Sequence, residues 1–393
     1  MASRDLSAAK LDGFAANDQT LRTFPAADGT VADSEKSKSQ GAARPTLADI
    51  ASITGVSKAT VSLVLRNSPT IPQRTHDRVH EAAKSLGYVY NRGAASLRST
   101  ETRLIAMAVN DLTNPYFAEI VASMEDALTE QNRIVLMCNT DESIARQRAF
   151  VEAVREYSVG GLLLVPATGT SASFIDLLRS WRLPCVSVSR AIPGAEVDLV
   201  QADHRSGMIA ATNHLLELGH RRIGMLGLNE NISTGRQRFE GYCQALTDAG
   251  IAIEPRLVLS GPATRDVGMA QLLTLLDLPE PPTAVVCFND VVAFGAMLGL
   301  RSRDLTPGRD FSVIGFDDIA EATLWRPALT SVAVARQVVG RTAARLLLER
   351  INDFNRPFET ILLPTELIIR DTTGAPVTSK KKARKAPDAR SRS

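Results

Sequence analysis

The chain has 393 residues, of which 44% are apolar, and its formal net charge is only +2. This length allows two or three domains with a sizeable core, and the mean hydropathy of −0.03 indicates a protein that folds in water. No apolar run reaches the length of a membrane span and the first residues lack the apolar core of a signal peptide, so the sequence disfavours membrane and secreted proteins.

The charge is distributed unevenly along the chain. Residues 1–43 show no periodicity and are rich in Ala, Ser, Asp and Gly, which predicts a disordered arm. Residues 44–102 hold 8 Lys and Arg against 4 Asp and Glu, whereas residues 103–373 hold 25 against 32. Because neutralisation of phosphates dominates the affinity for nucleic acid, a basic head on an acidic body favours a head that binds DNA.

Three short helices are predicted in this basic head, at residues 46–53, 58–65 and 72–86. Thr46 and Asp49 have the spacing of a capping box that opens the first helix. Gly55 suits a tight turn after that helix, and Ser57 can cap the second. Helices joined in this way form a helix-turn-helix, whose second helix enters the major groove through its N-terminal part. A plain helical hairpin is the alternative interpretation of this pattern taken alone.

The second of these helices has two distinct faces. Val61 and Val64 sit at helical spacing and face inward. Lys58, Ala59 and Ser62 are therefore left on the outer face, where a helix-turn-helix meets DNA. A short basic segment follows the third helix and is expected to form one more helix before the body begins.

From residue 103 onward, short apolar runs alternate with amphipathic helices. Strands are expected at residues 104–109, 134–138, 161–165, 185–188, 223–227, 257–259, 284–288 and 311–316. Helices are expected at residues 116–130, 143–157, 173–181, 208–218, 236–249, 267–276 and 291–300. Two such runs, divided near Asp203, predict two lobes with a cleft between them. The predicted fold class is an all-α helix-turn-helix head plus an α/β body of two doubly wound parallel-sheet lobes.

Polar and aromatic side chains follow several predicted strands, at the edge where ligands of open α/β sheets bind. They are Asn110, Asp111, Asn114, Tyr116, Phe117, Ser189, Arg190, Asn289, Asp290, Asp317 and Asp318, with Thr234 to Arg238 before a helix of the second lobe. Carboxylates, amides and arginines around aromatic faces suit a sugar or a small carboxylate, because they offer bidentate hydrogen bonds and an apolar platform. Each Asn or Asp can instead cap the helix that follows its strand.

The remaining motifs argue against an enzyme. The sequence has no Gly-rich phosphate loop, no GxSxG and no HExxH, and its five histidines show no paired metal spacing. We therefore expect neither a metal nor a cofactor. The cysteines are widely separated without a CxxC, which predicts free thiols in a reducing cytosol: Cys138, Cys185, Cys243 and Cys287. The basic tail at the C-terminus can be a solvated, disordered segment.

Taken in order and at their spacing, these motifs resemble bacterial regulators of the lactose-repressor (LacI/GalR) family over about residues 45–371. The matching stretches are Thr46-Leu-Ala-Asp-Ile-Ala, Gly55-Val-Ser-Lys-Ala-Thr-Val-Ser62, Leu86-Gly-Tyr88, Asn91-Arg92, Asn114-Pro-Tyr-Phe117, Leu218-Gly-His220, Asn289-Asp290 and Gly315-Phe-Asp-Asp318. The body also resembles periplasmic sugar-binding proteins of type I. The resemblance implies a cytoplasmic homodimer that binds a palindromic operator in double-stranded DNA and responds to a small effector in the cleft.

The resemblance also assigns residues to roles. Its DNA-binding set comprises Thr46, Ser57, Lys58, Ala59, Thr60, Ser62, Arg66, Tyr88, Asn91, Arg92, Ala94 and Leu97. Within that set, Lys58 and Ala59 face base edges, and Ala94 and Leu97 lie in the minor groove. Its effector-binding set comprises Asn114, Tyr116, Phe117, Ser189, Arg190, Thr234, Arg238, Asn289 and Asp317.

Four positions depart from the family pattern. Leu63 stands where a groove-reading Arg is common, and Arg66 stands where Asn is usual and could add a phosphate contact. Tyr90 replaces a common Pro and should loosen the start of the hinge. Ser189 stands where sugar-responsive members have Asp. We therefore expect an effector beyond hydroxyl-only sugars, with Arg190 able to take a carboxylate or phosphate.

The sequence thus predicts five segments: a disordered arm (1–43), a helix-turn-helix domain (44–90), a hinge helix and linker (91–102), a two-lobed effector-binding and dimerisation domain (103–371) and a basic disordered tail (372–393). The predicted function is transcriptional repression, with operator affinity controlled by a sugar or sugar derivative bound between the lobes. The alternative is a solute-binding protein that senses sugars without regulating DNA directly. On the operator, the repressor would be associated with the nucleoid.

Overall fold

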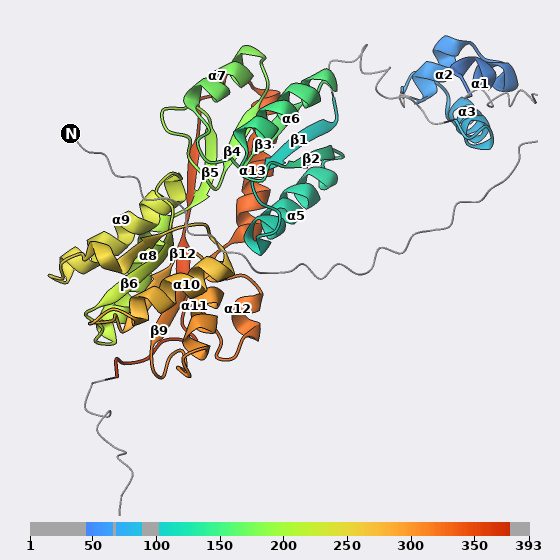
Figure 1. The fold of residues 1–393 in the computed structure, drawn as a ribbon. Coiled ribbons are helices and arrows are strands. Elements are labelled where there is room, and N and C mark those ends of the chain that lie inside the picture. Colours follow the sequence, from blue (N-terminus) through green and yellow to red (C-terminus); the bar gives the residue numbers. More distant parts are fainter. Residues whose placement is uncertain (1–44, 66–67, 89–101, 378–393) are drawn as a thin grey trace, which may run out of the picture. The chain divides into compact units, whose positions relative to one another are not determined.

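The computed structural model describes residues 45–65, 68–88 and 102–377 (Figure 1). The chain divides into two compact units, residues 1–91 and 92–393, and each is described on its own. The predicted arm, nearly all of the predicted hinge and most of the predicted tail lie outside the described residues.

The first unit contains three helices: α1 (Leu47–Thr54), α2 (Lys58–Leu65) and α3 (Gln73–Ser85). The Asp49 carboxylate accepts a hydrogen bond from the backbone N–H of Thr46 at 2.7 Å, which completes the capping box of α1. Gly55 ends that helix in the left-handed conformation, with φ of 66°. The Ser57 hydroxyl accepts from the Thr60 amide at 3.0 Å and so caps α2. The predicted helix-turn-helix is confirmed.

A small apolar core holds these three helices together. It consists of Ile50, Val61, Val64, Val79, Ala82 and Ala83. Val61 and Val64 are fully buried, as their helical spacing predicts, so the opposite side of α2 is turned away from the core. Within the described ranges no single helix is long and apolar enough to cross a membrane; α1 and α2 pass such a test only as a pair, and they are bent by 105°.

The body is built on two six-stranded sheets. The sheet of the first lobe has the order β11-β5-β4-β3-β1-β2, and that of the second has the order β12-β10-β9-β8-β6-β7. The strands of the first are β1 (Leu104–Val109), β2 (Ile134–Asn139), β3 (Gly161–Leu164), β4 (Cys185–Val188), β5 (Asp198–Ala202) and β11 (Thr360–Leu363). The strands of the second are β6 (Ile223–Leu228), β7 (Val258–Ser260), β8 (Ala284–Cys287), β9 (Ser312–Asp317), β10 (Thr330–Val334) and β12 (Thr365–Ile368).

Helices flank both sheets. The first lobe carries α5 (Pro115–Glu130), α6 (Ile144–Glu156), α7 (Ala172–Ser180) and α13 (Arg336–Asn352). The second carries α8 (His204–Glu217), α9 (Ser233–Asp248), α10 (Arg265–Leu276), α11 (Asp290–Arg301) and the short α12 (Glu321–Leu324). Most central strands are buried along their whole length, which explains why they read as continuous apolar runs.

The eight predicted strands are present, but the two lobes are not two consecutive halves of the chain. The helix α13 and the strand β11 return to the first lobe, where α13 packs against α5, β3, β4 and β5. Figure 1 shows α13, in orange-red, among the green and teal elements of that lobe. In addition, β12 runs antiparallel to β10, so the second sheet is parallel except at this edge. The elements β5, β10, β11, β12, α12 and α13 were not predicted.

The chain crosses between the lobes three times, and the crossings are bonded to one another. Asp203, at the first crossing, donates its amide to the carbonyl of Leu363, at the last, with a distance of 2.8 Å. The Thr365 hydroxyl donates to the carbonyl of Asp203 at 3.2 Å. Val334, just before the middle crossing, pairs with Thr365 in the second sheet. The three segments therefore form one hydrogen-bonded connection.

Candidate functional site

The DNA-facing candidates of the head lie at the start of α2. Ser57, Lys58 and Ala59 are all exposed there, whereas Ser62 is partly buried. Backbone N–H groups at a helix N-terminus and a Lys side chain both attract phosphate oxygens, so this end of α2 suits a polyanion. The Ser57 hydroxyl, which caps the helix, also lies 2.9 Å from the Thr60 hydroxyl, so both hydroxyls already have a partner.

Thr46 and Tyr88 lie at the two ends of the described head. The Thr46 hydroxyl donates to Asp49 at 2.8 Å, so its first role is to cap α1. Hydrogen bonds from Thr46, assisted by the charge of Lys58, hold the pKa of Asp49 below its ordinary value. Tyr88 is partly buried beside the core of the head. The other predicted DNA-binding residues lie outside the described ranges: Arg66, Asn91, Arg92, Ala94 and Leu97.

All nine predicted effector-binding residues line one cavity of about 860 Å³ between the lobes. The first lobe contributes Asn114, Tyr116, Phe117, Ser189 and Arg190, and the second contributes Thr234, Arg238, Asn289 and Asp317. They meet because the carboxyl ends of β1, β4, β8 and β9 open onto the same space. The cavity lies within the usual range of about 300–1,000 Å³ for a small-molecule site.

Aromatic rings and hydroxyls form the wall on the first lobe. Tyr116 and Phe117 meet edge to face, with ring centroids 5.0 Å apart. The hydroxyls of Tyr116 and Ser189 are 3.0 Å apart, so Ser189 stands as the partner of Tyr116. Burial and the nearby Asp317 carboxylate raise the pKa of Tyr116 to about 12, so its hydroxyl stays protonated. The wall thus offers neutral donors and acceptors next to an apolar face.

A buried ion pair forms the wall on the second lobe. Arg238 donates to Asp317 at 3.0 Å and to Nδ1 of His204 at 3.2 Å, and its guanidinium lies 3.7 Å from the Phe316 ring centroid. Arg238 also donates to the carbonyl of Phe288. Burial raises the pKa of Asp317 to about 6, although the charge of Arg238 opposes this rise. Burial and Arg238 lower the pKa of His204 well below its ordinary value, so this imidazole is neutral.

Two residues of the site have unusual backbone angles. Ser189 has φ of 63° and Asp317 has φ of 105°, both in the region that favours glycine. Residues held in such conformations store strain, and the surrounding structure must stabilise them. Both follow or end a strand at the edge of the cavity, which is where function most often retains strain.

Arg190 does not fit the role expected from the sequence. Both of its terminal nitrogens bind the Glu142 carboxylate, at 2.8 and 3.1 Å, and one also donates to the carbonyl of Pro166. The guanidinium that was expected to take an acidic group of the effector is therefore already paired. Sequence reasoning missed Glu142 because the pair spans 48 residues and no local pattern marks it.

Some strand-end residues cap the helix that follows and also line the cavity, so the two interpretations of these residues do not exclude each other. Asn114 and Asn289 each accept a backbone N–H with the side-chain oxygen, at 3.0 Å, and each still has an amide group with two donors. Asp290 instead binds Ser331 and the amide of Ile319. Asp290 and Asp318 are not among the residues that line the cavity. His204 also lines the cavity. It was not predicted, because the strand before it was missed.

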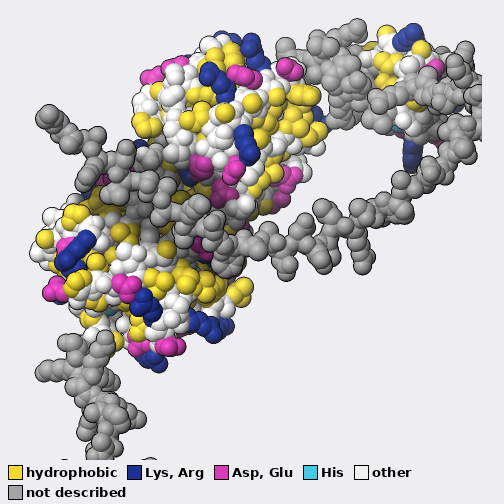
Figure 2. Space-filling model, in the orientation of Figure 1, with side chains coloured by type: hydrophobic (Ala, Val, Ile, Leu, Met, Phe, Trp, Pro, Cys, Tyr) yellow, Lys and Arg dark blue, Asp and Glu magenta, His cyan; other side chains and the backbone are white. Residues whose placement is uncertain are grey.

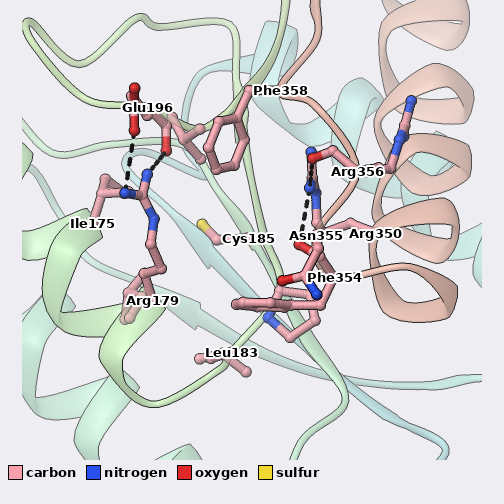
Figure 3. A pocket seen from close by; sticks show the side chains of 13 residues that line it. Ile175, Arg179, Leu183, Cys185, Glu196, Arg350, Phe354, Asn355, Arg356 and Phe358 are labelled. Atoms are coloured by element: carbon pink, nitrogen blue, oxygen red, sulfur yellow. Dashed lines mark hydrogen bonds and ion pairs between the residues drawn. The ribbon is translucent and has the colours of Figure 1, made fainter.

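A second cavity, of about 220 Å³, lies in the first lobe beside the start of β4 (Figure 3). Its floor is apolar and includes Leu183 and Cys185. Three arginines line it, and each has an acidic partner: Arg179 with Glu196, Arg350 with Asp198, and Arg356 with Glu349 and Glu359. Since these cations are already paired, the cavity offers a ligand far fewer polar groups than the one between the lobes.

Comparison with known proteins agrees with this architecture. Residues 46–91 match the model of bacterial regulatory proteins of the lacI family, and residues 212–373 match that of the periplasmic binding protein-like domain. The transcriptional repressor CytR of Escherichia coli K12 is 33% identical over 340 residues, which cover 86% of this chain and 99% of CytR. The repressor PurR of Haemophilus influenzae is 34% identical over 328 residues, which cover 83% and 97%.

Solved structures resemble the chain over the same length. The lac repressor dimer bound to operator and the anti-inducer ONPF superimposes with a TM-score of 0.77 at 25% identity, covering 84% of this chain and 99% of that one. The regulator CelR in complex with cellobiose gives a TM-score of 0.64 at 30% identity, covering 84% and 100%. A ribose-bound regulator from Enterococcus faecium gives 0.63 at 28%, covering 70% and 100%.

These likenesses extend over both the head and the body, so the alternative of a solute-binding protein without a DNA-binding role does not account for the chain. The relatives named above are repressors and not enzymes, in agreement with the absence of catalytic motifs. The chain therefore belongs to the lacI family of bacterial regulatory proteins, and it is a DNA-binding transcriptional repressor whose activity is controlled by a small-molecule effector.

Proposed function

We propose that this repressor acts as a homodimer on a palindromic operator and that a sugar or sugar derivative binds between its lobes. The convergence of nine residues from both lobes on one cavity carries this proposal. A ligand that contacts both walls must favour one angle between the lobes. By linkage, a ligand that prefers the DNA-incompetent angle lowers the affinity for the operator, and the operator lowers the affinity for the ligand equally.

A sugar suits the cavity chemically. The rings of Phe117 and Phe288 offer apolar faces for the C–H groups of a sugar ring. Asn114 and Asn289 have amide donors to spare, and Asp317 has a second carboxylate oxygen. Two of the similar solved structures, CelR and the Enterococcus faecium regulator, hold the sugars cellobiose and ribose.

The segment boundaries and the DNA contacts belong to the same proposal. Residues 44–90 form the DNA-binding domain, residues 91–102 the hinge and residues 103–371 the effector-binding and dimerisation domain. Ala94 and Leu97, in the part of the hinge outside the described residues, enter the minor groove. The protein works in the cytoplasm and, when bound to its operator, is associated with the nucleoid.

The experiment that tests the proposal is a titration of the DNA complex. An operator is first selected from a random duplex library, and the complex is then titrated with a panel of sugars and sugar derivatives. We expect one member to change the operator affinity by about 5- to 150-fold, the usual size of such a coupling. If none changes it, and none binds the protein alone, the sugar effector is wrong.

We expect Lys58 to determine part of the preference for operator sequence. We expect Lys58→Ala to lose about 1–3 kcal/mol of binding and to relax the preference at one position per half-site, because this exposed side chain faces base edges. Selection from a duplex library measures the preference. The control is Lys84→Ala, at the exposed end of α3, which should leave the preference unchanged. Equal relaxation by both variants would contradict the assignment.

The edge of the first sheet is a candidate for the interface between the two copies of the homodimer. Ile134 and Met137 on the edge strand β2 are 52% and 49% exposed, and Val121 and Ala122 on α5 are at least partly exposed. Apolar side chains gather on the side of the first lobe where β2 and α5 lie (Figures 1 and 2). An exposed edge strand with apolar side chains is normally buried against another element or another chain. We propose that a second copy of this chain buries it.

We expect Met137→Glu to weaken this dimer, because it places a charge in the centre of the covered surface. The loss should be about 2 kcal/mol or more, the size of an interface hot spot. Analytical ultracentrifugation over a concentration series measures it. Tyr157→Glu alters an exposed side chain at the end of α6 and should leave the assembly unchanged. A Met137→Glu protein as dimeric as the wild type would rule out this surface.

A further inference from the structure

Glu142 reaches the effector cavity from an unusual loop. Asp141 and Glu142, between β2 and α6, are consecutive residues in the left-handed conformation, with φ of 53° and 54°. Each costs conformational energy there, because non-glycine residues rarely adopt such angles. Ser143 then caps α6 by accepting the amide of Arg146. The backbone thus holds Glu142 in the cavity wall between two regular elements.

The Glu142 carboxylate is bonded on both oxygens. Oε1 accepts from Asn110 and from Arg190, both at 2.8 Å. Oε2 accepts from Arg190 at 3.1 Å and from the amide and hydroxyl of Thr168 at 2.8 and 2.9 Å. Burial alone would raise the pKa of Glu142, but the Arg190 guanidinium and these hydrogen bonds lower it to about 2. The group is therefore a carboxylate at any physiological pH.

This pair leaves the described part of the cavity without an unpaired cation. Two arginines line it, and each faces its own acid: Arg190 faces Glu142 and Arg238 faces Asp317. The lining carboxylates outnumber the arginines, since Asp111, Asp141, Glu142, Glu230 and Asp317 all line the cavity. An anionic ligand would therefore meet net negative charge and would have to displace Glu142 to reach Arg190.

We propose that Glu142 is a specificity-determining residue that occupies Arg190 from within the protein and so excludes anionic effectors in favour of uncharged, hydroxyl-rich ones. The inference rests on the proposed function, because it concerns the ligand of the same cavity. Asn110, whose side chain bonds Glu142, supports the inference. Its Oδ1 is buried without a hydrogen-bond partner in the described structure, while its amide is held by Glu142. A hydroxyl group placed next to that oxygen would satisfy it, whereas a carboxylate or phosphate group at the same place, which only accepts hydrogen bonds, would not.

Removal of Glu142 should turn Arg190 into an anion site. The Arg190 guanidinium is nearly buried and charged. Without Glu142 it would be stabilised by an ion pair with any acidic ligand that enters the cavity. The expected change is specific, because the apolar faces and the second ion pair of the cavity remain. Glu142→Gln keeps the shape and some of the hydrogen bonds, and Glu142→Ala removes them. Since Glu142 is 39% exposed at its side chain, neither change empties a core position.

The test measures binding of two anions and their neutral analogues by isothermal titration calorimetry on the full-length protein. The anions are D-glucuronate and D-ribose 5-phosphate, and the analogues are D-glucose and D-ribose. The wild type should bind neither anion more tightly than its analogue. Both Glu142 variants should bind at least one anion about tenfold more tightly than the wild type does, the size of one charge-assisted hydrogen bond. Combining Glu142→Ala with Arg190→Ala should remove this gain.

Two further variants separate pairing from overall charge. Glu152→Gln removes one negative charge from an exposed position on α6 outside the cavity and should bind anions as the wild type does. Glu230→Gln removes one from the cavity without freeing Arg190, and a gain as large as that of Glu142→Gln would overturn the proposal. The absence of a gain in both Glu142 variants would also overturn it. A gain in those variants, with no neutral sugar acting on the wild-type operator complex, would refute the sugar effector and leave the role of Glu142 standing.

Discussion

Asp317→Asn should strongly weaken the response of operator binding to the effector, so that more effector is needed for the same response, and leave operator binding itself near normal. Asp317 lies at the end of β9 in the wall of the cavity and belongs to the body, not the head. The substitution removes a charged acceptor, so effector affinity should fall by about 1.5–3 kcal/mol, or roughly 10- to 150-fold. The measurement is the titration of the operator complex with the effector found for the wild type. A ligand that shifts both proteins equally would show that the cavity is not the sensor.

The choice of Asn and of a neighbouring control keeps this test clear. Asp317→Ala would leave the buried Arg238 without a carboxylate or an equivalent polar group, and breaking a buried pair costs about 3–5 kcal/mol of folding. Asn keeps an acceptor at the same place. Asp318→Asn is the matched control, because Asp318 binds Arg370 at 2.6 Å and is not among the cavity residues. It should retain the full effector response.

Arg350→Leu should destabilise the body by about 3–5 kcal/mol, a large loss of stability for one substitution. Arg350 and Asp198 are almost wholly buried, with side-chain exposures of 2% and 0%, and they form two hydrogen bonds of 2.7 and 3.0 Å. Arg350 also donates to three backbone carbonyls, those of Phe354, Arg356 and Pro357 (Figure 3 shows part of this cluster). Leucine would leave the buried Asp198 charge without its cation, with the amide of Glu359 still bonded to it at 2.9 Å, and would remove the donor from these carbonyls.

Urea unfolding of the two proteins, followed by circular dichroism, measures the difference. Arg345→Ala is the control on the same helix, because Arg345 is 53% exposed and pairs only across one turn with Glu349. We expect this control to stay within about 0.5 kcal/mol of the wild type. An Arg350→Leu protein with the wild-type midpoint would mean that the buried cluster contributes nothing net to stability.

The same pair explains why part of the fold escaped prediction. β5 begins with Asp198, and a charged residue does not read as a buried strand unless its partner is known. That partner is Arg350, 152 residues later. The helix α13, in contrast, carries a readable signal, because Val339, Ala343 and Leu346 are buried at helical spacing. β10, β11 and β12 are short strands whose burial depends on the lobe that the chain has re-entered.

The two parts of the candidate site, the start of α2 and the cavity, differ in how far the sequence predicts them. The exposed start of α2 follows from local rules, since a cap, a glycine turn and an apolar stripe fix which residues point outward. The nine cavity residues were expected from their places at strand ends or before a helix, and from the family resemblance, and the topology explains why they meet. Glu142 and His204 could not be predicted, because each acts through a partner on another element. Arg190 was correctly placed at the cavity, but it was expected to be free to bind an acid. Its pairing with Glu142, on another element, could not be predicted.

The bonded connection between the lobes has a mechanical consequence. Three chain segments that cross independently would let the lobes twist, slide and bend, and the free energy of an effector would be spread over all these motions. The bonds of Asp203 to Leu363 and of Thr365 to Asp203 join the segments into a narrow ribbon. A ribbon of paired strands bends across its plane more easily than it shears within it. We therefore expect one bending motion to dominate between the lobes, so that a ligand bound between them changes mainly one angle.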